Sequence, residues 1–437
     1  MPTLTFPISR IEGHAQVVIE VHNGKVLSAR FQANEFRGFS YFVQGIPAEQ
    51  VSVIVPRICG VCSTAHHVCS VKTLEDAFGV TPPPLARKIR ELLLLGQIIQ
   101  NQATSIFIFT MPDRLNVDSI FQMENGMGGK AEKDGIAFKA LQVRKSGTDL
   151  ITLAGGQFIH PVKAVIGGVT SGISETDAAS MRQKIKAILP VACDLFDHYW
   201  QMSIAMGERI GSWGDDTPAY YIASTDESHP TYDTRKIRVT DPQGKYVDSF
   251  TAHEFREKLS FRESLHSYAG ETSFRDSIMR ANSLARINMA DWMGTPKADE
   301  YLRSFREQFG KPAHAIMLFD LARGIELVYA LERAMELLSE PLDKDDTDVP
   351  YSPRDGEGFG LVEAPRGPLI HHYTIEKGLI KEAEFIIPTV HNMRAISHAL
   401  MVAAQRYVTP DKVDMELEKA VGRVVRAFDP CISCATH

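Results

Sequence analysis

The sequence contains few cysteines, no basic stripe and no long uninterrupted apolar run. Six cysteines in 437 residues are too few for a secreted fold held by disulfides, which favours a reducing compartment. We find no run approaching the roughly 20 apolar residues of a membrane helix, and the first residues, MPTLTFPISRIEGH, lack the organisation of a signal peptide. The net charge of -7 comes from interspersed acidic and basic residues. These absences predict a cytoplasmic protein with no membrane span and no nucleic-acid partner.

The composition is that of a folded protein with a large core, because 44% of the residues are apolar and 23% are charged. Residues 15–31 predict a β-hairpin that turns at Asn23-Gly24. Residues 236–251 and 358–389 predict further strands, the latter with a turn near Lys377-Gly378.

Helical patterns cover more of the sequence than strand patterns do. Three prolines at 82–84, followed by periodic apolar residues, predict one long helix, and the capping box Ser174-x-x-Asp177 predicts the start of another. Further helices are predicted near 279–293, 322–339, 391–407 and 411–427. The predicted fold class is therefore α+β and mainly helical, with a central bundle of long helices and peripheral β-sheets and hairpins.

Four of the six cysteines form two Cys-x-x-Cys pairs at opposite ends of the chain, in RICGVCSTAH (57–66) and DPCISCATH (429–437). Each pair can chelate, and two pairs complete a shell of four thiolates for a soft metal. A structural zinc site is the alternative, but its pairs are usually about 15 to 20 residues apart, so that they hold a small knuckle together. Cys69 and Cys193 stand alone and are interpreted as small buried apolar residues.

Other polar residues stand near these pairs or in rigid settings. His66 follows Cys62 by four positions, within reach of a sulfur, although a lone histidine is more often a core residue. The cluster SRIEGH contains Glu12, and EAPRGPL holds Arg366 between proline and glycine. Each of these two alone would be interpreted as a surface feature.

Length alone suggests about three domains, on a prior of roughly 150 residues each. The clearest break is the acidic, proline-containing stretch 339–358, which we interpret as a solvated loop. A site that uses both cysteine pairs would bring the N- and C-terminal segments together at the metal. We therefore predict a single integrated domain over residues 1–437.

Taken together, the motifs resemble those of the large subunit of [NiFe]-hydrogenases, over essentially the whole chain. In chain order they are RIEGH (10–14), FRGF (36–39), RICGVCSTAH (57–66), GGQFIHP (155–161), EAPRG (363–367), IPT (387–389) and DPCISCATH (429–437). The paired cysteine motifs are specific, whereas the short motifs add weight by their order. The ending SCATH is most similar to the cytoplasmic, multi-subunit branch that couples hydrogen to soluble electron carriers.

The resemblance implies the ligands of a Ni-Fe centre. Cys59 and Cys431 would be terminal ligands of nickel, and Cys62 and Cys434 would bridge nickel to an iron that carries CO and cyanide. The implied activity is the reversible heterolytic cleavage of H2 into protons and electrons.

The resemblance also implies roles for residues around the centre. The proton would pass to the thiolate of Cys431 and then to Glu12. Arg366 would hang over the open side of the metals, oriented by Asp113. The remaining implied residues are Pro388 and Thr389, which would line the cyanide pocket, and His66, which would contact the bridging sulfurs.

Two departures from the family pattern change these expectations. Ser40 stands where the family motif usually has a glutamate that binds a third metal, Mg or Fe, together with the C-terminal histidine. We therefore doubt a third metal near His437 and expect hydrogen bonds to anchor that residue instead. The stretch before Asp113, QNQATSIFIFTMPD, also lacks the histidines often found there.

No Fe-S cluster motif remains once the two cysteine pairs are assigned, so the resemblance implies partners: an Fe-S small subunit, together with further electron-transfer subunits. A maturation endopeptidase would be another partner if the gene encodes an extension after His437. Two alternatives stay open: a structural four-cysteine zinc protein, and a non-catalytic relative of a respiratory-complex subunit. The intact cysteines argue against the second, because such relatives lack the ligands.

Overall fold

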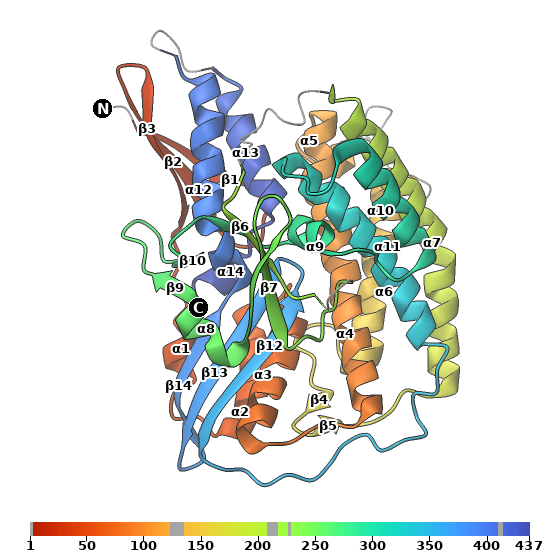
Figure 1. Ribbon diagram of the computed structural model, residues 1–437. Helices are drawn as coiled ribbons and strands as arrows, with labels where there is room; N and C mark the ends of the chain where they lie inside the picture. The colour runs from red at the N-terminus through yellow and green to blue at the C-terminus, as the bar shows by residue number, and fades with distance from the viewer. Residues whose placement is uncertain (1–2, 123–134, 208–216, 226–228, 410–413) are drawn as a thin grey trace.

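A bundle of long helices forms one side of the molecule, and small β-sheets with the remaining helices form the other (Figure 1). The computed structural model describes residues 3–122, 135–207, 217–225, 229–409 and 414–437. The long helices of the bundle are α4 (Pro84–Ala103), α6 (Ile136–Gly155), α7 (Glu175–Ile204), α10 (Pro296–Phe309) and α11 (Phe319–Leu337). The predicted fold class is confirmed.

The two helix starts that the sequence predicts are present. Pro84 occupies the first turn of α4, where its missing N–H costs no hydrogen bond. The Ser174 hydroxyl accepts a hydrogen bond from the Asp177 amide at 3.1 Å and caps α7.

Three antiparallel strands open the chain: β1 (Thr3–Ile8), β2 (Ala15–His22) and β3 (Lys25–Ala33). The predicted hairpin is β2–β3, and Asn23 and Gly24 adopt the positive φ angles, 49° and 69°, that such a tight turn needs. A second three-stranded sheet consists of β12 (Gly356–Ala364), β13 (Gly367–Glu376) and β14 (Leu379–Ile386), with the predicted turn at 377–378. Helix α3 (Ser63–Phe78) packs on this sheet.

The remaining sheets are smaller. One has the order β11-β6-β7-β8, in which β7 (Lys236–Thr240) and β8 (Tyr246–Thr251) are the predicted strands of 236–251. The other strands are β4 (Ala164–Val165), β5 (Gly168–Val169), β6 (Tyr220–Ala223), β9 (Leu259–Arg262), β10 (Glu271–Phe274) and β11 (Met279–Arg280).

The C-terminal helices α12 (Pro388–Tyr407) and α13 (Leu417–Phe428) lie beside the N-terminal strands, and the short α14 (Ile432–Ala435) follows them (Figure 1). This arrangement brings the N-terminal and C-terminal segments of the described chain together. The shorter helices are α1 (Phe39–Phe42), α2 (Ala48–Ile54), η1 (Val55–Ile58), η2 (Thr104–Thr110), α5 (Met111–Leu115), η3 (Ile120–Gln122), η6 (Ala252–Glu254), α8 (Phe255–Lys258), α9 (Ser283–Met289) and η7 (Ile316–Leu318).

Two sequence predictions need correction. The helix predicted near 279–293 is only α9, because residues 279–280 pair with β6 as β11. The stretch 339–358 is a loop as far as residue 355, and its last three residues belong to β12.

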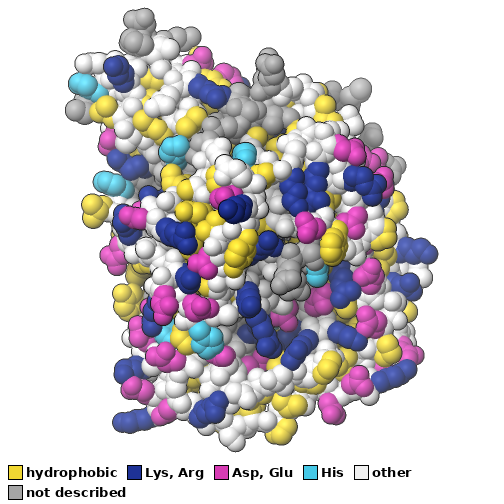
Figure 2. Space-filling view, viewed as in Figure 1, with side chains coloured by type: hydrophobic (Ala, Val, Ile, Leu, Met, Phe, Trp, Pro, Cys, Tyr) yellow, Lys and Arg dark blue, Asp and Glu magenta, His cyan; other side chains and the backbone are white. Residues whose placement is uncertain are grey.

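The apolar stretch that the sequence argument overlooked is Pro84–Leu115, which is long and apolar enough to cross a membrane by length and composition. However, 83% of its most apolar window is buried inside the protein, as expected for the core helix of a bundle. On the face seen in Figure 2, cationic and anionic side chains are interspersed, as the sequence indicates.

Candidate metal centre

The four paired cysteines meet in the interior, with all four Sγ atoms within 4.8 Å of one another. The Sγ of Cys431 lies 3.3 Å from that of Cys59 and 3.8 Å from that of Cys62. The Sγ of Cys434 lies 2.7 Å from that of Cys62 and 2.9 Å from that of Cys431. The chain therefore brings together the ligand set that the sequence predicts from two distant motifs.

Local structure positions each pair on a tight turn. Cys59 follows η1, and Cys62 immediately precedes α3. Cys431 caps the N-terminus of α14, and Cys434 lies within that helix. Gly13 permits this close packing, because a Cβ at this position, where φ is +79°, would lie 2.8 Å from the Cβ of Ile432.

Glu12 joins the N-terminal segment to the second cysteine pair. The Cys431 thiol donates a hydrogen bond to Oε2 of Glu12 at 3.1 Å, and the Ser433 amide donates to the same oxygen at 3.0 Å. The Ile432 amide donates to the Glu12 carbonyl oxygen at 3.1 Å. Burial, followed by the nearby Cys59 sulfur, raises the pKa of Glu12 above its ordinary value. A carboxyl group with a raised pKa, in contact with a thiol, can accept and release a proton.

A buried hydrogen-bonded chain leads away from Cys434. Nε2 of His66 lies 3.4 Å from the Cys434 Sγ, and its Nδ1 lies 3.0 Å from Nε2 of His371. Nδ1 of His371 lies 2.8 Å from the Tyr373 hydroxyl, which donates to Oγ of Ser70 at 2.9 Å. Burial lowers the pKa of His66 to about 4 and holds that of His371 well below its ordinary value, so both rings are neutral at pH 7.

Arg366 lies beside the cysteines on the turn between β12 and β13. Its guanidinium donates to a carboxylate oxygen of Asp429 at 3.1 Å and also to the Asp429 carbonyl oxygen. Asn101 donates to the other carboxylate oxygen at 3.1 Å. Burial lowers the pKa of Arg366, but Asp429 and the Cys431 sulfur outweigh it, so the guanidinium remains charged.

The expectation that Asp113 orients Arg366 is wrong in this structure. The carboxylate of Asp113 accepts hydrogen bonds from Arg10 at 2.6 Å and from Arg426 at 2.6 and 2.9 Å. These two cations lie on the N-terminal segment and on α13, so Asp113 joins those two parts of the chain. Asp429 occupies the orienting position instead.

A small cavity adjoins the Cys62 and Cys434 side of the cluster. Its wall is mainly apolar and is formed by Ala65, Ala364, Pro365, Leu369, Ile387 and Pro388, with His66, Arg366 and Thr389 as polar members. The Thr389 hydroxyl accepts a hydrogen bond from the Cys431 amide at 3.0 Å, which leaves its proton available as a donor.

His437 is held by local contacts. Its Nδ1 donates to the Cys434 carbonyl oxygen at 2.8 Å, and its ring packs edge-on against Phe385. Ser40 and His437 line the same surface pocket. Among the described residues, the four cysteines are the only group of three or more His, Cys, Asp or Glu side chains arranged to hold a metal.

The electrostatics of the four sulfurs fit a cationic centre. Hydrogen bonds from the other three cysteines lower the pKa of Cys59, whereas burial raises the pKa values of Cys62, Cys431 and Cys434. Four anionic sulfurs this close together repel one another unless metal charge compensates them. The donor set therefore fits one or two thiophilic metal ions.

Sequence reasoning missed three polar residues of this region: Asp429, Asn101 and His371. Asp429 lies within the motif DPCISC, and its φ of 50° lets it leave α13 and turn back toward Arg366. Its position next to a cysteine pair could have identified it from the sequence. Asn101 and His371 lie in a helix and a strand with no local motif, so only the tertiary fold identifies them.

These features define a protein whose two ends enclose a buried four-thiolate metal centre with an acidic and a guanidinium group beside it. The sequence profile described as nickel-dependent hydrogenase matches residues 37–133 and 215–437, and a profile described as HoxL-like matches residues 5–36. The chain belongs to the nickel-dependent hydrogenase family, as a large subunit.

Two relatives illustrate the branch. The chain is 35% identical to a vhu subunit of the F420-non-reducing hydrogenase of Methanocaldococcus jannaschii, over 91% of this chain and 97% of that one. It is 29% identical to the NAD-reducing hydrogenase HoxS subunit beta of Cupriavidus necator, over 99% of this chain and 93% of that one.

Among solved structures, the fold matches that of an NAD+-reducing [NiFe]-hydrogenase in the H2-reduced state with a TM-score of 0.92 and 29% identity, over 100% of both chains. The Ni-Fe-Se hydrogenase from D. vulgaris Hildenborough matches with a TM-score of 0.83 at 22% identity, which shows a shared fold. These similarities do not favour the zinc and respiratory-complex alternatives.

Proposed function

We propose that this chain binds a Ni-Fe centre through Cys59, Cys62, Cys431 and Cys434 and catalyses the reversible cleavage of H2. The observation that carries the proposal is the contact between the Glu12 carboxylate and the Cys431 sulfur at a buried four-cysteine cluster. Cys59 and Cys431 would be terminal nickel ligands, and Cys62 and Cys434 would bridge to an iron with CO and cyanide ligands. When bound, such a metal pair supplies the two-electron redox chemistry of hydrogen.

The residues of the chain move the proton. The Cys431 sulfur lies within hydrogen-bond reach of Glu12, so a proton on that sulfur can pass to the carboxylate in one step. The raised pKa of Glu12 reduces the energetic difference between the two positions. Glu12 is only partly buried, so it can pass the proton outward.

The other neighbours hold the site in place. Arg366, fixed by Asp429, presents a positive charge to the cluster. Pro388 and Thr389 would line the pocket for the iron ligands, and Nε2 of His66 would contact the Cys434 sulfur. We propose no third metal at His437, because Ser40 offers no carboxylate there.

Electrons must leave through a partner, which we propose is an Fe-S small subunit, with further electron-transfer subunits beyond it. Gly60, between Cys59 and Cys62, is exposed at the surface. Val53 on α2 and Ile159 and Val162 beyond α6 are exposed apolar side chains, and His160 donates from Nδ1 to the Pro56 carbonyl oxygen at 3.1 Å, which holds the 157–162 segment against η1. We propose this apolar surface as the small-subunit docking face.

We further propose that residues 1–437 act as one domain in the cytoplasm. Side chains from both ends of the described chain enter the same hydrophobic core, which supports this proposal. A maturation endopeptidase would act on this chain only if its gene encodes residues beyond His437.

The test is infrared spectroscopy of the purified complex in the stretching region of metal-bound CO and cyanide, combined with elemental analysis for Ni, Fe and Zn. We expect CO and cyanide bands together with nickel and iron. A silent region with one zinc per chain would show that the four thiolates form a structural site.

A further inference from the structure

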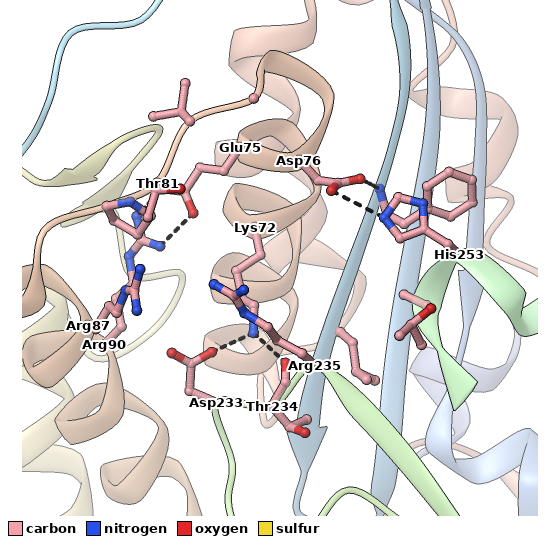
Figure 3. A pocket seen from close by; sticks show the side chains of 17 residues that line it. Lys72, Glu75, Asp76, Thr81, Arg87, Arg90, Asp233, Thr234, Arg235 and His253 are labelled. Atoms are coloured by element: carbon pink, nitrogen blue, oxygen red, sulfur yellow. Dashed lines mark hydrogen bonds and ion pairs between the residues drawn. The ribbon is translucent and has the colours of Figure 1, made fainter. Parts of the chain in front are cut away.

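A second cavity, of about 640 Å³, lies at the far end of α3 from the metal centre. Its lining comes from the end of α3, the start of α4, residues 233–235, η6 and β12. Lys72, on its wall, follows Cys62 by ten positions in α3, which corresponds to about 15 Å along the helix. Figure 3 shows how cationic side chains from these segments gather around the cavity.

Two of the cations in this cavity are already paired. Arg90 binds both oxygens of Glu75, at 2.9 and 2.6 Å, and Lys72 binds Asp233 at 2.5 Å (Figure 3). Each acidic side chain there therefore already has a partner, since Asp76 contacts His253 at 3.2 Å.

Two more cations, Arg87 and Arg235, are exposed on the same wall. Neither forms a side-chain hydrogen bond or a salt bridge within the described ranges of the chain. The buried Nε of Arg90 also has no hydrogen-bond partner there. This cavity therefore contains hydrogen-bond donors without an acceptor and about two positive charges without a paired anion.

The pKa of Asp233 reflects this excess of positive charge. Burial acts to raise the pKa of Asp233, but Lys72, Arg90 and Arg87 outweigh burial and keep that pKa below its ordinary value. A further anion placed between these side chains would meet the same attraction.

Part of the cavity wall is apolar. It includes Val80, Pro82, Phe359 and Leu361, and the His253 ring lies 4.5 Å from the ring of Phe359. A cavity with an apolar wall, a few converging polar groups and a volume of about 300 to 1,000 Å³ is typical of small-molecule sites.

We propose that this cavity binds a small phosphorylated molecule, whose phosphate group is held by Arg87 and Arg235 and whose organic part contacts the apolar wall. A phosphate ester carries about -1.5 to -2 charges at pH 7, which matches the two unpaired guanidinium groups. Arginine forks bind phosphate oxygens in pairs, which favours phosphate over a halide, and the larger charge of the phosphate ester favours it over a lone carboxylate. The site is separate from the metal centre and does not depend on the proposed hydrogenase function.

The probe is inorganic pyrophosphate, measured by isothermal titration calorimetry on the purified complex at fixed ionic strength, with inorganic phosphate and chloride as comparison anions. We expect saturable binding of one pyrophosphate per chain, weaker binding of phosphate and none of chloride. The variant is the double substitution Arg87→Ala and Arg235→Ala, which we expect to weaken binding at least tenfold. Hydrogen turnover without the ligand should stay unchanged, because neither side chain contacts the metal centre.

The matched control is Arg182→Ala with Arg303→Ala, which also removes two exposed arginines but outside the cavity. We expect the control to bind pyrophosphate as the unaltered protein does. Absence of saturable binding, or equal weakening in both double variants, would overturn the proposal. The charge reversal Arg235→Glu provides a second variant, and retained binding in it would contradict the proposal as well.

Discussion

At the scale of single residues, the Glu12 carboxylate is the group best placed to receive a proton from the cluster, because it contacts the Cys431 sulfur at 3.1 Å. Glu12→Gln keeps an oxygen that can accept the Ser433 amide but cannot carry the proton. We expect hydrogen turnover to fall by about 100-fold or more, the usual range for loss of a general acid or base. The measurement is the rate of H2 oxidation with an artificial electron acceptor.

The control for this substitution is Glu35→Gln, which alters an exposed carboxylate that pairs with His14. Nickel and iron contents should be unchanged in both variants, since Glu12 is not among the four proposed ligands. Full turnover in Glu12→Gln would remove Glu12 from the proton path.

A second residue-scale prediction concerns Glu363, which shares the single charge of buried Arg286 with Glu326. Burial, only partly offset by Arg286, raises the pKa of Glu363 from 4.5 to about 7. The folded protein therefore binds a proton that the unfolded chain releases. This contribution to stability is fully present below about pH 4.5 and is lost as the pH rises toward 7, for a total of at most about 3 kcal/mol.

Glu363→Gln is neutral at every pH, so we expect it to flatten the fall in unfolding temperature between pH 4.5 and 7. Thermal unfolding across this range checks the prediction. Glu382→Gln, an exposed position on β14, is the control and should keep the slope of the unaltered protein. Equal slopes in all three proteins would contradict the assignment.

At the scale of elements, the close crossing of α4 and α6 depends on glycine. A Cβ on Gly147 would lie 2.5 Å from the backbone nitrogen of Gln100 and 2.7 Å from the Gly96 carbonyl oxygen. Glycine to alanine within a helix usually stabilises by about 1 kcal/mol, but here rigid backbone must move, which typically costs about 1 to 3 kcal/mol.

We therefore expect Gly147→Ala to lower the free energy of unfolding, measured by urea denaturation. Thr152→Ala, at an exposed position of the same helix, is the matched control and should change stability by less than about 0.5 kcal/mol. A stabilised Gly147→Ala would mean that the two helices can separate at little cost.

Elements with a local signal were predictable from the sequence, and elements defined by tertiary pairing were not. The capping box at Ser174 and the Asn23-Gly24 turn are each determined by residues that are neighbours in the sequence, and both appear as predicted. Strand β1 lacks a turn signal of its own and forms by pairing with β2. Residues 279–280 carried a helical pattern, but pairing with β6 made them a strand.

The same contrast holds for the metal centre. Cysteine spacing identified all four sulfurs, because the chelating pairs are local. The partner of Arg366 was wrongly assigned to Asp113, because only the fold determines which carboxylate reaches a buried guanidinium.

At the scale of the whole molecule, the apolar docking face at Val53, Ile159 and Val162 should control assembly. Ile159, whose side chain is 50% exposed, would meet the small subunit directly. We expect Ile159→Lys to weaken assembly at least tenfold, because a charge in an apolar interface loses its water. Leu27→Lys, at an equally exposed position on β3, should assemble normally. Co-purification and analytical ultracentrifugation of the complex are the measurements.

The pairing of Glu12 with Cys431 and Ile432, and of the Arg37 amide with the Thr436 carbonyl oxygen, fixes α14 between the first and last parts of the fold. During synthesis, the first cysteine pair leaves the ribosome hundreds of residues before the second. Until residue 434 is released, the first pair can offer a metal only half of the donors. The complete centre therefore cannot form before residue 434 has left the ribosome.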